Sequence, residues 1–232
     1  MKMPISRGLF TALCLVFCIA ASGAQTITTA DSFFSSVSDA YAKINDYSST
    51  IVISYGATSK KDTMTGRSVF KVPNLLRIDF TNPAEQTIVF NGDELTIYLP
   101  TYNVILTQSV EKSSGSSGAS LATPQGLSLM KRYYSVAYET KSDPVPLEEN
   151  SKEQVIILLL SRKTTTEMFR TIRLMISPDT KLIRRIDALT ISGDHVQFDF
   201  TGYSLNQGVL DNRFVYDSPA SANIFNDFLF NQ

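Results

Sequence analysis

Apolar and polar side chains alternate in short runs from residue 47 onward, and this alternation constrains the fold more than any other feature of the chain. Within residues 47–55, Tyr47, Ile51 and Ile53 fall on one side, whereas Val52 and Ser54 fall on the other. Side chains point to alternate faces along a β-strand, so this run predicts a strand with one apolar face. Further strands are predicted at 69–72, 76–80, 88–90, 95–99, 133–138, 155–160, 169–176, 182–191, 195–200 and 213–216. Short strands in such quick succession favour antiparallel pairing.

Turn and loop residues separate these runs. Asn91-Gly92 is typical of a tight hairpin turn, and residues 177–180 form a second turn pattern with a proline in it. A polar turn is predicted at residues 56–62. Residues 111–126, rich in serine and glycine, and residues 141–154 are predicted to be solvated loops that support no core.

The chain begins its folded part with a different period. Between residues 29 and 46 the large side chains recur every three or four positions, which predicts an amphipathic helix capped by Thr29 or Asp31. A second short helix is predicted from Leu127. The apolar side of the first helix consists of Phe33, Val37, Tyr41 and Ile44. Together these patterns predict an α+β fold in which one antiparallel sheet of about ten or eleven strands curls around its apolar face.

The first 24 residues have the features of a cleavable signal peptide. Lys2 and Arg7 precede a short apolar run, and small residues lead up to Ala24, so cleavage is expected before Gln25. We therefore interpret residues 1–24 as a signal peptide and residues 25–232 as a single domain. The two cysteines of the chain, Cys14 and Cys18, both lie in the first segment. Lipidation at Cys18 is the alternative, but lipoprotein signals prefer a small residue where this chain has Phe17.

Charge argues against two classes of partner. Removal of Lys2 and Arg7 leaves 19 basic residues against 22 acidic ones, a net charge of about −3, with no basic cluster longer than a pair. Nucleic acid and anionic membrane surfaces are therefore not expected partners. The pairs Lys60-Lys61 and Arg184-Arg185 are interpreted as solvated positions.

Groups suited to catalysis or metal binding are few. His195 is the one histidine and follows a predicted turn, so we interpret it as an exposed hairpin residue. Paired carboxylates occur at Glu148-Glu149 and Asp93-Glu94, where solvated charge is expected. Motifs for serine hydrolases, nucleotide binding or dinucleotide binding are absent. We therefore expect a protein that is not an enzyme and that uses neither a metal nor a cofactor.

Large apolar side chains are abundant on the predicted strand faces. Ordinary core packing accounts for them in one interpretation. In the other, a curled sheet is only partly filled by its helices and leaves an apolar cavity. The residues concerned are Phe70, Leu76, Ile78, Phe80, Ile88, Phe90, Leu95, Ile97, Phe198 and Phe200. Periodicity alone does not distinguish the two interpretations.

One stretch resembles a known family. Residues 66–80, GRSVFKVPNLLRIDF, combine a glycine, a strand, a Pro-Asn-Leu step and a second strand, which is similar to the outer-membrane lipoprotein carrier family, LolA. The resemblance continues through Pro83, residues 86–100 and Val104. It returns in Pro178-Asp179, in residues 182–186 and in the segment from Phe214 to Pro219.

This resemblance implies a fold and a function. Members have a half-open, incomplete antiparallel β-barrel whose concave apolar face is covered by a lid of helices. The implied function is a periplasmic chaperone that binds the acyl chains of lipoproteins and ferries them from the inner to the outer membrane. The implied partners are acylated lipoproteins, an inner-membrane lipoprotein-releasing transporter and an outer-membrane acceptor, with the carrier acting as a monomer.

Specific residues follow from the resemblance. Leu76, Ile78 and Phe80 match cavity-lining positions of the family, and the helix with Phe33, Val37, Tyr41 and Ile44 matches part of the lid. Together with the other apolar residues of these strand faces, they give an expected acyl-chain cavity lined by Phe70, Leu76, Ile78, Phe80, Ile88, Phe90, Leu95 and Ile97. Well-studied members carry an arginine before the Pro-Asn step, where it latches the lid. Here that position is Val72, which leaves Lys71 and Arg77 as candidates to replace it.

Two other functions remain compatible with the same pattern. One is a periplasmic binder of free lipids or glycolipids, which an apolar cavity would also accept. The other is a sensor of mislocalised lipoproteins that regulates a membrane partner.

Overall fold

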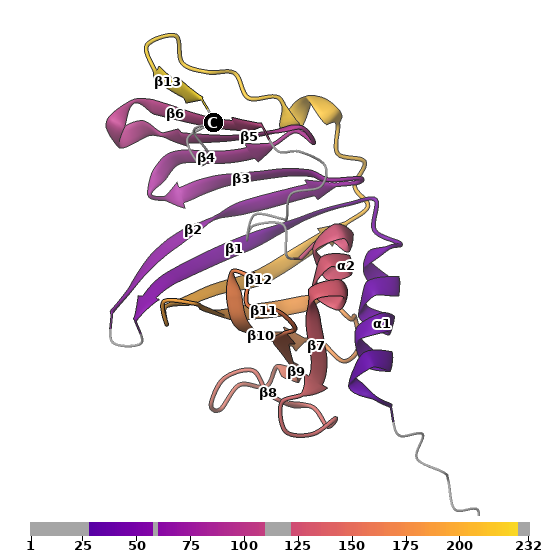
Figure 1. Ribbon diagram of the computed structural model, residues 1–232. Helices are drawn as coiled ribbons and strands as arrows, with labels where there is room; N and C mark the ends of the chain where they lie inside the picture. Colours follow the sequence, from indigo (N-terminus) through magenta and orange to yellow (C-terminus); the bar gives the residue numbers. More distant parts are fainter. Residues whose placement is uncertain (1–27, 58–59, 110–121, 227–232) are drawn as a thin grey trace, which may run out of the picture.

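The computed structural model describes residues 28–57, 60–109 and 122–226. Its main element is one open sheet of thirteen strands, in the order β13-β6-β5-β4-β3-β2-β1-β12-β11-β10-β9-β7, with β8 paired to β9 (Figure 1). Since the order ends at β13 on one side and β7 on the other, the sheet does not close. The predicted fold class, an incomplete antiparallel barrel with helices, is confirmed.

The first half of the sheet is made of consecutive strands joined by short connections. Its bounds are β1 (Asp46–Ala57), β2 (Lys60–Lys71), β3 (Leu75–Asn82), β4 (Ala84–Phe90), β5 (Glu94–Leu99) and β6 (Val104–Ser109). The second half comprises β7 (Tyr134–Tyr138), β8 (Val145–Pro146), β9 (Gln154–Arg162), β10 (Phe169–Ile176), β11 (Ile183–Thr190) and β12 (His195–Leu205). Pairing of β1 with β12 joins the halves.

Helices and short elements complete the described chain. They are α1 (Ala30–Tyr41), α2 (Pro124–Tyr133), the 3₁₀ turns η1 (Pro100–Tyr102) and η3 (Asp211–Phe214), and the edge strand β13 (Asn223–Asn226). Thr29 caps α1, because its hydroxyl accepts a hydrogen bond of 3.1 Å from the Ser32 amide. The helix ends at Tyr41, five residues earlier than the periodicity predicted.

Four details of the predicted strands are wrong. The described strands number thirteen rather than ten or eleven, because β6, β8 and β13 were not predicted. Polar residues 60–66 belong to β2, since the whole strand is paired with β1 in register. Residues 211–214 form η3 where a strand was predicted at 213–216. Finally, β13 pairs with β6 in parallel, so the sheet is not entirely antiparallel.

Strand register collects the apolar side chains on one face of the sheet, which we call the inner face. One cross-strand row runs through Ser68, Ile78, Ile88 and Ile97. A second row runs through Ile53, Phe198, Ile186, Leu174 and Leu158. Because neighbouring side chains in such rows are in contact, the inner face continues from β5 across β1 to β9.

The opposite face carries charge and a small separate core. Val69, Val89 and Phe214 form that core beneath the segment that contains η3. In the other half of the sheet, Arg185 binds Asp199 at 2.5 Å and Arg173 binds Glu139 at 2.6 Å. Charged rows of this kind keep the outer face of the β9–β12 half solvated, so the large apolar core of that half lies on the inner face.

At Gly66, strands β2 and β3 lie very close together. A Cβ atom at this position would lie 2.5 Å from the carbonyl oxygen of Asp79 and 2.9 Å from the Cα of Phe80. Both neighbours are backbone atoms, so they cannot rotate away. A glycine is required here by the spacing of β2 and β3.

We predict that Gly66→Ala destabilises the protein by about 1–3 kcal/mol, because the added methyl group forces β2 and β3 apart. Urea unfolding followed by circular dichroism measures this as a lower midpoint. Gly208→Asn is the control, since Gly208 has nothing within 4 Å and its φ of +72° suits asparagine. Equal effects of the two substitutions would contradict the explanation.

Candidate apolar binding face

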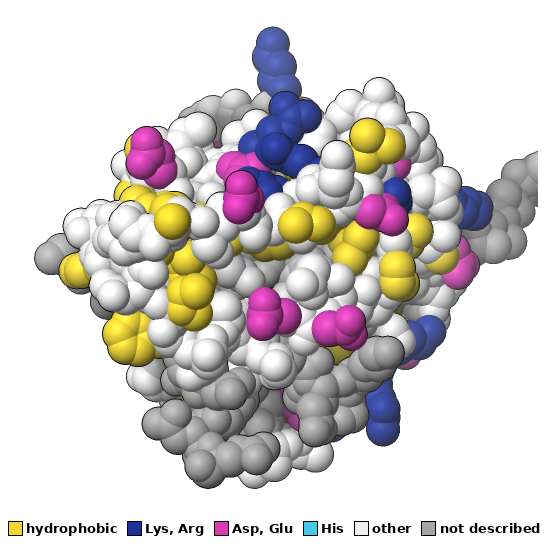
Figure 2. Space-filling model, turned by 90° about the horizontal axis from the view of Figure 1, so that it is seen from above, with side chains coloured by type: hydrophobic (Ala, Val, Ile, Leu, Met, Phe, Trp, Pro, Cys, Tyr) yellow, Lys and Arg dark blue, Asp and Glu magenta, His cyan; other side chains and the backbone are white. Residues whose placement is uncertain are grey.

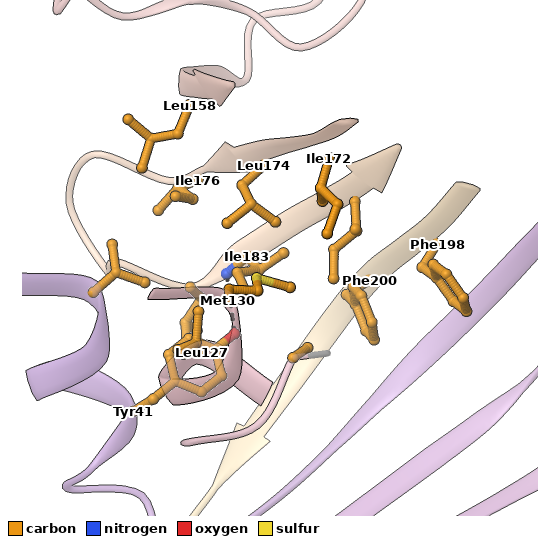
Figure 3. Packing of buried hydrophobic residues seen from close by; sticks show 14 of the residues in the cluster. Tyr41, Leu127, Met130, Leu158, Ile172, Leu174, Ile176, Ile183, Phe198 and Phe200 are labelled. Carbon is orange, nitrogen blue, oxygen red and sulfur yellow. Dashed lines mark hydrogen bonds between the residues drawn. The ribbon is translucent and has the colours of Figure 1, made fainter. Parts of the chain in front are cut away.

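The two helices fill one half of the inner face. Leu127 and Met130 of α2 and Tyr41 of α1 lie against Leu174 and Ile183 of the sheet (Figure 3). Within the described residues, α1 and α2 contact each other and β7. Figure 1 accordingly shows both helices beside the β7–β12 half, with β3 to β6 toward the other end of the molecule.

The sheet is wider than its helical cover. Twelve strands follow one another in the sheet order, and strands are about 4.8 Å apart, so the sheet extends over roughly 50 Å measured along its curve. Two helices side by side cover roughly 20 Å. The inner face therefore extends well beyond α1 and α2.

The structure brings the eight predicted cavity residues onto this face. Four of them are buried in the main core: Phe70 (1 % exposed), Leu76 (4 %), Ile78 (0 %) and Phe80 (4 %). Ile88 and Phe90 are only partly buried and pack against that core. Leu95 is buried and Ile97 is partly buried, and both lie outside the main core cluster. The inner-face side chains are thus less completely buried in the main core on β4 and β5 than on β3.

The predicted lid residues all point into the core. Phe33, Val37 and Tyr41 are buried on one side of α1. Ile44 lies beyond the end of the helix but is also buried, with 5 % exposure. Sequence periodicity found these four side chains, although it assigned Ile44 to the helix.

Tyrosine hydroxyls attach α1 to the sheet. The hydroxyl of Tyr41 accepts a hydrogen bond of 3.1 Å from the Ile183 amide. Tyr203 donates from its hydroxyl to the Ile183 carbonyl at 2.9 Å, and its oxygen lies 3.5 Å from that of Tyr41. Burial raises the pKa of Tyr41 above the ordinary 10.0 and that of Tyr203 well above it. Both hydroxyls are therefore neutral at physiological pH, as this network requires.

Three further contacts hold α2 and the residues before it. Tyr47 donates a buried hydrogen bond of 3.0 Å to the Ala122 carbonyl. Gln125, in the first turn of α2, donates to the Pro73 carbonyl, and Lys131 donates to the Ser35 hydroxyl of α1 at 2.8 Å. Each of these contacts is a single hydrogen bond, so the helices are attached at a few points.

The residues considered as replacements for the family's arginine latch lie elsewhere. Lys71 donates to the Val209 carbonyl at 2.7 Å and pairs with Asp211. Arg77 binds Asp79 at 2.8 Å. It also donates to the Arg213 carbonyl at 3.1 Å. Both cations thus bind the outer face and the C-terminal segment, while Val72 is 36 % exposed.

Charged groups singled out in the sequence take part in pairs on the outer face. His195 contacts Asp187 through Nδ1 at 2.9 Å and its side chain is 36 % exposed, so it is less open than expected. The prediction that Arg184 and Arg185 are solvated is wrong. Arg184 binds Glu153, Arg185 binds Asp199 and Glu148, and the two arginine side chains are only 15 % and 16 % exposed.

The described residues offer neither a metal-binding cluster nor a membrane-spanning helix. They contain no group of three or more histidine, cysteine or acidic residues that could hold a metal ion. Among the helices described, none is long and apolar enough to cross a bilayer. The predicted signal peptide lies outside the described residues, as do most of the serine-rich loop and the last six residues.

Comparison with known proteins assigns the chain to a family. The family model described as outer membrane lipoprotein carrier protein LolA matches residues 52–217. The chain belongs to this family. Its resemblance to lipoprotein carriers, first visible in residues 66–80, is thereby confirmed, and the family is one of carrier proteins.

Individual relatives agree with the family. An outer-membrane lipoprotein carrier protein of Leptothrix cholodnii is 27 % identical over 93 % of this chain and 94 % of its own length. One from Pseudomonas putida is 24 % identical over 77 % of this chain and 78 % of its own length. A solved structure, an uncharacterized conserved protein from Thermus thermophilus, covers 83 % of this chain and 98 % of its own, with 14 % identity and a TM-score of 0.53. That likeness shows the fold.

Removal of the Tyr41 hydroxyl tests the attachment of α1. Tyr41→Phe leaves the Ile183 amide buried without its partner, so we expect a loss of about 1–3 kcal/mol in the free energy of unfolding. Urea denaturation measures it. Tyr102→Phe is the control, because Tyr102 is 74 % exposed. If the two variants unfold alike, the hydroxyl does not stabilise the closed arrangement.

Alkaline pH should weaken the same region. Burial raises the pKa of Tyr47 well above 10.0, so the hydroxyl stays protonated in the folded chain at a pH where the unfolded chain ionises. The contribution of the Tyr47 hydroxyl to the free energy of unfolding is complete below about pH 10, and it is lost as the pH rises toward the pKa of this group in the folded protein. We expect the free energy of unfolding to fall between about pH 9 and pH 11 less steeply for Tyr47→Phe than for wild type. Parallel curves would contradict this assignment.

Proposed function

We propose that this protein is a periplasmic carrier that binds the acyl chains of lipoproteins on its inner face and moves them from the inner to the outer membrane. The observation that carries the proposal is the extension of the apolar inner face beyond its two helices, from β3 to β5. Family membership and the names of the two relatives support it. In this proposal residues 1–24 direct export and residues 25–232 form the carrier domain.

Hydrophobic free energy is sufficient for such binding. Each methylene removed from water contributes about 0.8 kcal/mol, so one long acyl chain gains roughly 10 kcal/mol on entering an apolar site. A membrane offers the same gain, which makes extraction from a bilayer close to neutral. An inner-membrane transporter that releases lipoproteins and an outer-membrane acceptor are therefore the partners we propose, and the carrier itself acts as a monomer.

The proposed acyl-chain site consists of two zones. Ile88, Phe90 and Ile97 are partly open and provide the first contacts. Phe70 and Ile78 are at most 1 % exposed, so a chain reaches them only when the inner face opens. Leu76 and Leu95 share a cross-strand row with Phe70 and Phe90, and Phe80 lies on the same face of β3, opposite Gly66. Binding deep in the core is thus coupled to displacement of the helices and their hydrogen bonds.

The helix contacts suit this coupling. A neutral hydrogen bond contributes about 0.5–1.5 kcal/mol, so the few that involve Tyr41, Tyr47 and Gln125 sum to less than the gain from one acyl chain. The buried helix side chains, such as Phe34, Val37 and Leu127, contribute about 1.5–3 kcal/mol each as well. Opening is therefore unfavourable without cargo, and bound acyl chains have to replace these apolar contacts as well as the hydrogen bonds. The same argument applies to free lipids, which the inner face would accept as well.

Introduction of a charge at Ile97 tests the proposal. Ile97→Asp places a carboxylate on the inner face, and we expect at least a tenfold lower yield of co-purifying acylated protein, because a buried charge opposes the acyl chain. Thr107→Asp is the matched control, since Thr107 is also partly buried but faces the other side of the sheet on the neighbouring strand β6. Mass spectrometry of material bound to the protein isolated from the periplasm gives the measurement.

Three results are distinguishable. Acylated protein bound to wild type and to Thr107→Asp, but lost from Ile97→Asp, supports the carrier. Free lipid without acylated protein supports the alternative function, a binder of free lipids or glycolipids. Equal loss in both variants would show that the inner face is not the site.

A further inference from the structure

A pocket lies beside α2, on the half of the inner face that is away from β3 to β5. It occupies about 400 Å³ between α2 and the hairpin that joins β9 to β10. Apolar groups from three segments line it, among them Leu129, Tyr133, Met168 and Phe169. Met168 is 61 % exposed, which is unusual for a large apolar side chain. A pocket of this volume is within the range of sites that hold small molecules, about 300–1,000 Å³.

Four basic residues surround one side of this pocket. The sequence shows them as two distant pairs, Lys131-Arg132 and Arg162-Lys163. In the fold, the Nζ atom of Lys163 lies 3.2 Å from the Lys131 carbonyl oxygen and 3.1 Å from that of Arg132. We call these four residues the basic rim.

Contacts tie the basic rim to the pocket wall. The Arg132 guanidinium lies over the ring of Tyr133, 5.2 Å from its centroid. The Lys163 amide donates to the Tyr133 carbonyl at 2.9 Å. Arg162 is the cross-strand neighbour of Tyr134, which also lines the pocket. The cations are therefore held beside the apolar lining.

The charge of the basic rim is largely uncompensated. None of its four residues forms a salt bridge with a carboxylate in the part of the chain that the structure describes. By contrast, Arg173, Arg184 and Arg185 on the outer face all do. Glu167, which lines the pocket, is bonded to the Thr164 hydroxyl at 3.4 Å and offsets one of the four charges.

We propose that the pocket and the basic rim form a second lipid site, which takes one anionic phospholipid from a membrane surface. One acyl chain occupies the space between α2 and the β9–β10 hairpin, and the phosphate contacts Arg132, Arg162 and Lys163. A pocket with apolar lining, bordered by lysine and arginine side chains that have no carboxylate partner in the described residues, matches the two ends of such a lipid. The site lies on the inner face but away from the cargo zone proposed at β3 to β5, and it concerns how the protein meets a bilayer. The expectation that anionic membranes are not partners was drawn from net charge, whereas here four cations are gathered locally by the fold.

Vesicle sedimentation tests the charge requirement. We expect binding to vesicles of phosphatidylglycerol mixed with phosphatidylcholine and little binding to phosphatidylcholine alone. Replacing Lys131, Arg132, Arg162 and Lys163 by glutamine should weaken binding by about tenfold or more, since each cation near an anionic surface contributes. The matched control replaces four exposed lysines elsewhere, Lys43, Lys61, Lys141 and Lys152, by glutamine and should change binding little.

A single substitution tests occupation of the pocket. Met168→Asp should weaken phosphatidylglycerol binding severalfold while leaving the fold intact, because the side chain is mostly exposed. Leu210→Asp is the control and should bind as wild type does. Leu210 is 69 % exposed and precedes η3, which contacts β3. Thermal unfolding of each variant confirms that it is folded.

Three results would overturn the proposal. Equal binding to neutral and anionic vesicles would remove the role of the basic rim. An equal loss in the two glutamine variants would reduce the effect to net charge. If the basic-rim variant loses vesicle binding and Met168→Asp does not, the protein is attracted to the charged surface but no lipid chain enters the pocket. The vesicles contain no lipoprotein, so these results are independent of the carrier function.

Discussion

The structure depends on one constraint, which is that most apolar side chains of β1 to β5 and of β9 to β12 lie on the same face of an open sheet. Such a face must be removed from water, and a closed barrel would achieve this by wrapping the sheet upon itself. Here the sheet ends at β13 and β7, and two short helices are packed on one half. The remaining half has less helical cover, and its burial decreases from Ile78 to Ile97. A protein built in this way leaves part of an apolar face partly exposed next to its own core.

Balance between closure and opening follows from how the helices are attached. Tyr41, Tyr47 and Gln125 each supply one neutral hydrogen bond, and the buried apolar sides of α1 and α2 supply hydrophobic contacts that an acyl chain can replace. Lys71 and Arg77 instead fix the C-terminal segment on the outer face. The C-terminal segment on the outer face is thus held by charged side chains, whereas the polar contacts of the helices on the inner face are hydrogen bonds of hydroxyl and amide groups.

Much of the fold follows from local pattern, and the errors have identifiable causes. Period-two alternation located most strands, and the three-to-four spacing found the buried side of α1. The polar start of β2 was missed because its partners in β1, not its own residues, determine it. Residues 213–216 were taken for a strand because Phe214 and Tyr216 alternate, but Phe214 is the anchor of a 3₁₀ turn. The edge strand β13 depends on pairing with β6, which no local pattern reveals.

The candidate site could likewise be predicted only in part from the sequence. Alternation placed Leu76, Ile78 and Phe80 on one face, and register then brought Ile88 and Ile97 beside them. Sequence reasoning found neither the tyrosine network around Ile183 nor the basic rim, because the residues of each are far apart in the chain. Tyr203 and Lys163 gave no signal of their own.

Site-specific photo-cross-linking tests the central claim most directly. A photoreactive phenylalanine analogue at position 97, facing inward from β5, and one at position 107, facing outward from β6, are compared during periplasmic transport of a lipoprotein and of its non-acylated variant. The account predicts a cross-link from position 97 to the acylated protein alone, and none from position 107. A cross-link from position 97 that is independent of acylation, or none at all, would contradict the inner face as the acyl-chain site.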